Sequence, residues 1–304
     1  MLICRRPRPT RRTQRPVTHD IDDTRGAQPT GAARGGTLYV VGTPIGNLDD
    51  LSPRARDVLG RVSAIAAEDT RRTSGLLSTI GVKKPLIALH EHNEDRRAEA
   101  LLARLSEGQS LALVSDAGMP LISDPGWRLV ERALEAGIDV RTVPGPSAVT
   151  AALSVAGLPT DRFVFEGFLP ARGAARRDRL QRLAGEPRTL LFYEASHRIA
   201  ESLEDMAAVF GPGRRAVLAR ELTKLFETVL DGSLAELAAR VRADPDQRKG
   251  EFVLVVEGAG DDGAAVLAEG RRVYALLDAH LPPSKAARLA AEITGAPRKA
   301  LYGR

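Results

Sequence analysis

Short hydrophobic runs alternate with longer amphipathic stretches in the first half of the chain. The runs cover residues 38–41, 62–67, 85–89, 111–114 and 140–143. Brief apolar runs bounded by glycine or polar residues are typical of strands buried on both faces of a parallel sheet. The stretches between them place hydrophobic residues at helical spacing, and one begins with the N-terminal signal Ser52-Pro53. This alternation predicts an open parallel α/β sheet.

The second half is richer in strands than in connecting helices. Strands are predicted over residues 163–166, 188–193, 215–219, 227–231 and 251–256, with helices over 199–210 and 234–242. Too few crossover helices remain for an all-parallel sheet, so a second α/β domain with a mixed sheet is expected. Three more helices follow, over residues 264–279, 284–294 and 297–302, and Gly295 is a candidate helix stop. The last two have the spacing of a helix-turn-helix, although packing alone also explains such helices.

The ends of these patterns define four parts of the chain. We expect a disordered basic tail over residues 1–35, α/β domains over 36–146 and 147–260, and a small helical domain over 264–304. Residues 1–34 hold eight arginines and three aspartates, a balance of +5, which equals the net charge of the whole chain. The remaining residues are therefore charge-balanced, and overall basicity does not by itself indicate a nucleic-acid-binding protein.

Several classes of protein are excluded by composition. The 304 residues contain no apolar run long enough for a membrane span, and the N-terminus lacks the apolar stretch of a secretory signal. Cys4 is the only cysteine, so neither an internal disulfide nor a cysteine-rich metal site is possible. A cytoplasmic protein is expected.

The candidate chemistry lies where the predicted strands end, which is where open α/β sheets bind ligands. The loop over residues 42–47 lacks the lysine of a P-loop and the three-glycine dinucleotide fingerprint. The loop over residues 115–126 is rich in small residues and carries two aspartates. Asp124 is expected to cap the next helix, which leaves Asp116 as the better candidate for a ligand contact.

Two charged clusters have ordinary explanations as well as functional ones. The histidines at 90 and 92, with neighbouring glutamates, match no strong zinc signature, and Asn93 also reads as a helix cap, so no metal is expected. The arginine-rich segment over residues 172–182 predicts either a solvated helix face or a phosphate-contacting loop.

In order along the chain, these motifs resemble those of the tetrapyrrole methylase family, the class III S-adenosylmethionine-dependent methyltransferases. The resemblance is carried by residues 38–51, 67–73, 115–126, 143–148, 192–198, 219–224 and 250–257. Thr43-Pro44-Ile45 and Ser115-Asp116-Ala117 stand where the precorrin-modifying branch has more glycine-rich or aromatic loops, which fits the RNA-modifying branch.

The resemblance implies two α/β domains, a methyl donor in the cleft between them, and a homodimer. Carried over by position, it implies that S-adenosylmethionine contacts Ser115, Asp116, Ala117, Gly118, Pro120, Leu121, Ile122, Ser147, Ala148, Phe192, Tyr193, Leu218, Ala219, Glu251 and Phe252. An apolar slot with a few polar groups at a domain junction suits such a ligand.

The implied reaction is methylation of the ribose 2′-oxygen of a cytidine in 16S ribosomal RNA, on free RNA or on the small ribosomal subunit. The candidate general bases are Glu68, Asp69, His92 and Glu94, and neither spacing nor resemblance selects among them. The candidate RNA contacts are Thr43, Asn47, Arg71, Arg72, Arg176, Arg177 and Lys224. Two alternatives remain, a tetrapyrrole C-methyltransferase and a non-catalytic ribosome-binding factor.

Overall fold

The computed structural model describes residues 35–90, 93–260 and 263–301 of the chain. The predicted tail, apart from its last residue, lies outside the described residues, as does His92.

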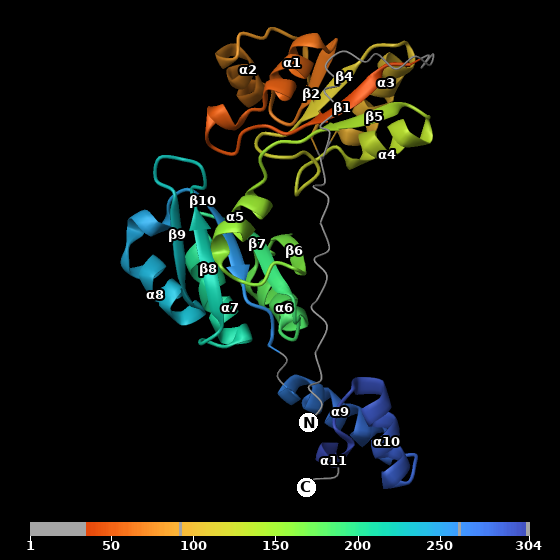
Figure 1. The fold of residues 1–304 in the computed structure, drawn as a ribbon, viewed down its shortest axis with the longest axis vertical. Coiled ribbons are helices and arrows are strands. Elements are labelled where there is room, and N and C mark those ends of the chain that lie inside the picture. The colour runs from red at the N-terminus through yellow and green to blue at the C-terminus, as the bar shows by residue number, and fades with distance from the viewer. Residues whose placement is uncertain (1–34, 91–92, 261–262, 302–304) are drawn as a thin grey trace, which may run out of the picture. The chain divides into compact units, whose positions relative to one another are not determined.

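The first sheet is parallel throughout and has the strand order β3-β2-β4-β1-β5 (Figure 1). Its strands are β1 (Thr37–Val41), β2 (Ala64–Ala67), β3 (Leu86–Ala88), β4 (Leu111–Val114) and β5 (Asp139–Val143). β1 and β4 are neighbours in the sheet although they are far apart in the sequence. The loops that follow them therefore leave the same edge of the sheet side by side.

Helices cover both faces of this sheet, because its strands are buried on both sides. One apolar cluster joins it to α1 (Pro53–Arg61) and α2 (Thr70–Thr79), and another joins it to α3 (Glu94–Ser106) and α4 (Trp127–Glu135). A 3-10 turn, η1 (Leu48–Asp50), precedes α1.

The second sheet is mixed, with the order β6-β7-β10-β8-β9. Only β6 and β7 run parallel, and the other neighbours are antiparallel. The strands are β6 (Phe163–Phe168), β7 (Thr189–Ala195), β8 (Arg215–Arg220), β9 (Thr228–Ser233) and β10 (Glu251–Val256). The predicted fold class, a parallel sheet followed by a mixed sheet and C-terminal helices, is confirmed.

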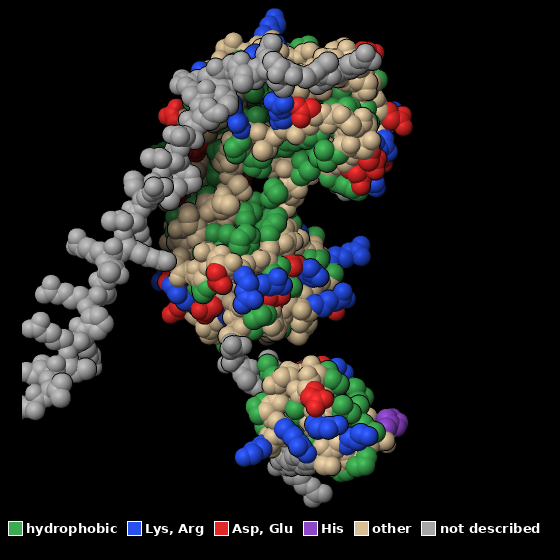
Figure 2. Space-filling model, turned by 45° about the vertical axis from the view of Figure 1, so that its right-hand side comes forward, with side chains coloured by type: hydrophobic (Ala, Val, Ile, Leu, Met, Phe, Trp, Pro, Cys, Tyr) green, Lys and Arg blue, Asp and Glu red, His purple; other side chains and the backbone are tan. Residues whose placement is uncertain are grey.

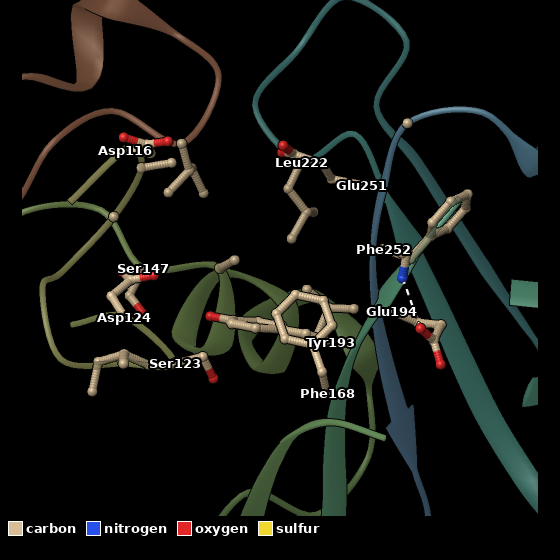
Figure 3. A pocket seen from close by; sticks show the side chains of 18 of the residues that line it. Asp116, Ser123, Asp124, Ser147, Phe168, Tyr193, Glu194, Leu222, Glu251 and Phe252 are labelled. Carbon is tan, nitrogen blue, oxygen red and sulfur yellow. Dashed lines mark hydrogen bonds between the residues drawn. The ribbon is translucent and has the colours of Figure 1, made fainter. Parts of the chain in front are cut away.

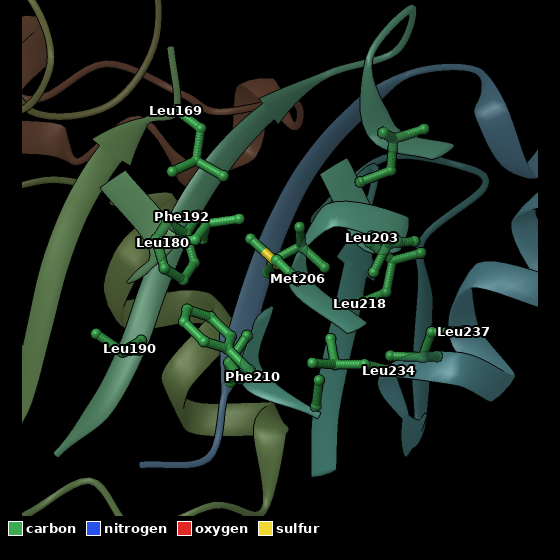
Figure 4. Packing of buried hydrophobic residues seen from close by; sticks show 14 of the residues in the cluster. Leu169, Leu180, Leu190, Phe192, Leu203, Met206, Phe210, Leu218, Leu234 and Leu237 are labelled. Atoms are coloured by element: carbon green, nitrogen blue, oxygen red, sulfur yellow. The ribbon is translucent and has the colours of Figure 1, made fainter. Parts of the chain in front are cut away.

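The second sheet also has two covered faces. The helices α6 (Gly173–Leu183), α7 (Ile199–Phe210) and α8 (Leu234–Ala243) pack on one face around Phe192 and Met206 (Figure 4). The short helix α5 (Ala148–Ala156) packs on the other. A 3-10 turn, η2 (Pro245–Arg248), joins α8 to β10.

The C-terminal helices are α9 (Gly263–Asp278), α10 (Pro283–Thr294) and α11 (Arg298–Leu301), with a small apolar cluster of their own. Gly295 ends α10 in the left-handed conformation at φ 73°, as predicted. Pro282 precedes this helix as its N-cap residue, and Ser284 lies inside its first turn. No helix among the described residues is both long and apolar enough to cross a membrane.

Two helices of the first sheet differ from the sequence prediction. The helix α2 was not predicted, since Gly75 and several hydroxyl residues lower its propensity; Asp69 caps its start and Leu77 is buried. The helix α4 begins at Trp127 rather than at Asp124, and Asp124 is not its cap.

Glu94 explains where α4 begins. This carboxylate, on the first turn of α3, is 7% exposed and accepts hydrogen bonds from the backbone N–H groups of Gly126 (3.1 Å) and Arg128 (2.8 Å). It therefore satisfies donors at the start of α4 from a different helix, and it ties the two helices together.

Substituting Glu94→Ala should lower the free energy of unfolding by about 1–3 kcal/mol, because it leaves two shielded N–H groups without an acceptor. Urea denaturation followed by circular dichroism measures the change. Glu99→Ala, at an exposed position of the same helix, is the control and should change stability by less than about 0.5 kcal/mol. Equal stability of both variants would contradict this role.

Candidate functional site

A cavity of about 500 Å³ is lined by residues of both sheets (Figure 3). This volume lies in the range of small-molecule pockets, about 300–1,000 Å³. Its lining consists of Ile45, Glu68, Arg72, Asp116, Ala117, Gly118, Met119, Ile122, Ser123, Asp124, Ser147, Ala148, Phe168, Tyr193, Glu194, Ala195, Ser196, Ala219, Leu222, Gly250, Glu251, Phe252 and Val253.

Close backbone contacts hold the loops after β1, β4 and β5 together at the edge of the cavity. Thr43 and Gly118 form an isolated antiparallel bridge, with N–H to carbonyl distances of 2.9 and 3.1 Å. Gly42 and Gly145 cross so closely that a Cβ on Gly42 would lie 2.7 Å from the Cα of Gly145. Only glycine fits such a crossing, so Gly42 and Gly145 are required for the packing of these loops.

The loop over residues 115–126 is held in a strained conformation. Leu121 and Ser123 have φ of 73° and 67°, although neither is glycine. Left-handed conformations of this kind cost of order 1–3 kcal/mol per residue and concentrate at ligand sites. Ser123 and Asp124, in this strained segment, both line the cavity.

Acidic side chains dominate the first-sheet side of the cavity. Glu68, Asp116 and Asp124 line it with a single cation, Arg72, whose guanidinium is 3.4 Å from the Asp116 carboxylate. Asp116 also accepts a hydrogen bond from the backbone N–H of Asp69 at 3.0 Å, so it does have a local structural partner. Three carboxylates against one guanidinium favour a ligand that carries positive charge.

Burial perturbs two of these carboxylates. Desolvation, with smaller contributions from the charges of Glu68 and Asp116, raises the pKa of Asp124 to about 6, although a hydrogen bond with the Ser115 hydroxyl opposes the shift. Desolvation, followed by the Asp116 charge, also raises the pKa of Glu68. Perturbed carboxylates in a cavity are typical of functional sites.

The second-sheet side of the cavity is largely aromatic and aliphatic. The rings of Phe165 and Phe168 both meet Tyr193 edge-on, with centroids 4.9 and 5.5 Å apart. Desolvation, with the Asp124 charge, raises the pKa of Tyr193 to about 12. Figure 3 shows Phe168, Tyr193 and Leu222 across the cavity from Asp116 and Asp124. This apolar wall is suited to a flat ring system.

The structure brings ten of the fifteen predicted donor contacts into the lining of this cavity: Asp116, Ala117, Gly118, Ile122, Ser147, Ala148, Tyr193, Ala219, Glu251 and Phe252. It does not place Ser115, Pro120, Leu121, Phe192 and Leu218 in that lining. Phe192 and Leu218 are fully buried in the cluster under α6 and α7. Successive strand residues face opposite sides of a sheet, so their neighbours Tyr193 and Ala219 face the cavity instead.

The four predicted bases have different environments. Glu68 lines the cavity, whereas Glu94 is buried and engaged by two backbone N–H groups. Asp69 caps α2, and its hydrogen bonds with Arg71 lower its pKa to about 2. His92 lies outside the described residues. Glu68 is thus the one described candidate that reaches the cavity.

Thr43 and Asn47, two predicted RNA contacts, serve the backbone. Thr43 is 1% exposed and its hydroxyl donates to the carbonyl of Ser115 at 3.3 Å. The Asn47 side chain accepts from the N–H of Asp49 at the start of η1. Thr43 is therefore buried rather than available for the expected RNA contact. Its hydroxyl and its backbone bridge hold two loops together.

The predicted cations are less free than the sequence suggests. Arg176 is 2% exposed and pairs with Asp205 (2.6 Å) and Glu201 (3.2 Å), which contradicts its expected role in phosphate contact. Its segment is the helix α6, one of the two forms considered. Arg177 is exposed and also pairs with Asp205, at 3.1 Å.

Three other predicted cations are paired near the cavity. Arg71 is exposed and pairs with Asp69, and Arg72 lines the cavity. The Lys224 ammonium bridges Glu221 (2.8 Å) and Glu251 (2.9 Å). These cations therefore help to set the conformation of the cavity rim.

Several lining residues were missed in the sequence. Asp124 was interpreted as a helix cap because a proline follows it, and nothing local reveals that Glu94 performs that task. Phe168 lies two residues beyond the predicted end of its strand, which extends past Gly167 through an irregularity in the register. Period-two alternation from Tyr193 identifies Ala195 as a second residue on the same face.

Comparisons with known proteins agree with this architecture. Residues 37–238 match the family model for tetrapyrrole (corrin/porphyrin) methylases, and residues 264–304 match an RsmI C-terminal helix-turn-helix domain. The solved structures of the methyltransferase CobJ (23% identity, TM-score 0.56) and of diphthine synthase (16%, 0.55) cover 74% and 73% of this chain, and 95% and 89% of their own. At such identities they show the shared fold alone.

Curated relatives are much more similar. A ribosomal RNA small subunit methyltransferase I from Xylella fastidiosa is 67% identical over 88% of this chain and 98% of its own length. Proteins of that name from Escherichia coli O157:H7 and Pseudomonas aeruginosa are each 56% identical over 88% of this chain and 93% and 95% of theirs. With the family model covering residues 37–238, these similarities show that the chain belongs to the tetrapyrrole methylase family.

Proposed function

We propose that this protein transfers a methyl group from S-adenosylmethionine to the ribose 2′-oxygen of a cytidine in 16S ribosomal RNA. The observation that carries the proposal is the 67% identity, over nearly the whole length, to a protein named as a small-subunit ribosomal RNA methyltransferase. The match of residues 264–304 to the C-terminal domain model supports the same branch of the family.

The cavity suits the donor chemically. S-adenosylmethionine carries an adenine ring, which the wall around Phe168 and Tyr193 accommodates. It also carries a sulfonium and an ammonium group, and the carboxylates on the opposite wall of the cavity attract these positive charges. When bound, the sulfonium supplies an activated methyl group, so the protein mainly has to orient the acceptor.

We assign distinct roles to the two perturbed carboxylates. Glu68 follows β2 beside the exposed Arg72, where an acceptor ribose with its phosphate reaches it, and burial raises its proton affinity. It is the general base for the 2′-hydroxyl. Asp124, deeper in the strained loop and facing Tyr193, stabilises the positive charge of the donor.

The protein acts as a homodimer in the cytoplasm, on small ribosomal subunits or their RNA. Two large apolar side chains on the connection between β8 and β9, Leu225 (89% exposed) and Phe226 (67% exposed), support burial by another chain.

The proposal is tested with the full chain, labelled S-adenosylmethionine and small ribosomal subunits from cells that lack this modification. We expect label in 16S RNA, in a nucleotide whose 3′ bond resists alkaline hydrolysis, since that hydrolysis needs a free 2′-hydroxyl. Subunits that already carry the modification are the control and should accept no label. Label in uroporphyrinogen or precorrin instead would identify a tetrapyrrole enzyme, and no transfer to any acceptor would identify a binding factor.

Glu68→Gln should lower kcat by about 10²–10⁴-fold, the usual contribution of a general base. Donor affinity, measured by calorimetry, should fall far less than kcat, because Asp116 and Asp124 still line the cavity and the side chain keeps its size. Glu135→Gln, at an exposed position on α4, is the matched control and should leave both constants unchanged. A Glu68→Gln enzyme with normal kcat would exclude this base.

Donor affinity should depend on the ionisation of Asp124. Below its pKa of about 6 the carboxyl is neutral and no longer attracts a cation, so the Kd of S-adenosylmethionine should rise as pH falls, by about tenfold at pH 5. Asp124→Asn should weaken binding at pH 7.5 and flatten this dependence. Asp161→Asn, at an exposed position, should retain the wild-type profile. An unchanged pH profile in Asp124→Asn would contradict the assignment.

A further inference from the structure

A second cavity, of about 690 Å³, adjoins the first on the second sheet. It is lined by Ser196, His197, Ala200, Glu201, Arg242, Pro245, Arg248 and Lys249. Ser196 lines both cavities, and Lys249 is separated from Glu251, in the first cavity, by one glycine. The two cavities are therefore neighbours along one strip of the surface.

The backbone of this second cavity is held in place by several hydrogen bonds. The Arg220 guanidinium donates to the carbonyl groups of Asp246 (3.1 Å) and Lys249 (3.2 Å), at either end of the cationic turn. The Asp244 carboxylate caps the same turn, η2, by accepting from the N–H of Asp246. Arg248 and Lys249 thus project from a turn with a fixed backbone, which lowers the entropic cost of binding a ligand.

Cationic groups are in excess here, although basic and acidic groups are interspersed on the face drawn in Figure 2. Arg248 makes no ion pair with any described residue. The bridge from Lys249 to Asp246 joins two side chains that are each 75% exposed, so it is weak and easily exchanged for another anion. Arg242 pairs with Glu204, and this pair is likewise exposed and therefore weak. The one carboxylate of the lining, Glu201, is itself paired with the buried Arg176.

Gly250 separates the cationic turn from the first cavity. Its φ is 101°, and a Cβ there would lie 2.5 Å from the side chain of Glu221. A conformation that favours glycine thus joins the cationic turn to Glu251. Cations consequently face one cavity, and the acidic and aromatic lining faces the other.

We propose that the cavity lined by His197, Arg242, Arg248 and Lys249 binds a backbone phosphate of the RNA strand whose neighbouring nucleotide enters the first cavity. The inference rests on the proposed function. Methyl transfer to a ribose inside a cavity requires a splayed single strand, and the phosphates on either side of that ribose must lie within one or two nucleotides of it. A fixed cationic turn next to the donor cavity suits such a phosphate and carries no base specificity.

The test compares Arg248→Gln/Lys249→Gln with the wild-type full chain, using small ribosomal subunits that lack the modification. We expect KM for subunits to rise several-fold at moderate KCl, with kcat at saturation and donor affinity unchanged. The dependence of log KM on log[KCl], at constant Mg²⁺, should become shallower by about 0.7 for each phosphate of the single strand that the variant no longer neutralises. Unchanged donor affinity shows that the variant is folded.

Arg61→Gln/Lys83→Gln is the matched control. It removes the same charge from exposed sites on the first sheet's side, and Arg61, like Lys249, loses a surface pair with a carboxylate. This control should retain the wild-type salt dependence. A second variant, Arg248→Lys/Lys249→Arg, keeps both positive charges and should also retain it. An unchanged salt dependence in Arg248→Gln/Lys249→Gln, or an equal loss in the control, would overturn the proposal. Failure of the wild-type chain to methylate subunits would instead refute the proposed function.

Discussion

The contact between the Gly42 and Gly145 backbones is the constraint on which the candidate site depends. The N–H of Gly42 donates to the carbonyl of Val143 at 3.0 Å, and the next residue bridges to Gly118. Three loops that are far apart in the sequence are thereby fixed at one edge of the first sheet. A single methyl group at this crossing would force the loops apart. The strained loop that carries Asp124 is positioned only because this crossing holds its neighbours.

The two neighbouring cavities are lined by side chains of opposite charge. The first gathers carboxylates that are partly buried, and this burial raises the pKa values of Glu68 and Asp124. A cationic ligand compensates for that cost, whereas a polyanion would increase it. The second cavity offers the opposite charge within a few residues along the chain. An RNA methyltransferase needs this separation, because its donor is positively charged and its acceptor strand is negatively charged.

Most of the fold could be predicted from hydrophobic pattern, since strand runs and helix spacing depend on local sequence. The parallel first sheet and the helix at Ile199–Phe210 follow directly from it. The site could be predicted less completely, because its details depend on contacts between distant residues. Glu94 is a candidate general base in sequence, yet it caps a helix that begins 33 residues later, at Trp127. Asp124 was predicted to be that cap. Because Glu94 accepts the hydrogen bonds at the start of α4 instead, Asp124 can line the cavity.

Arginines illustrate why net charge is a poor guide to nucleic-acid binding. The most basic segment of the sequence beyond the tail, α6, places Arg176 inside the protein, where Asp205 and Glu201 neutralise it. Arg248, in a less conspicuous segment, makes no ion pair with any described residue. Pairing in the folded chain thus determines which cations can meet a phosphate. A charge-balanced body can bind a polyanion when its carboxylates are already engaged with buried arginines and when cations that are unpaired, or paired only at the exposed surface, share one cavity.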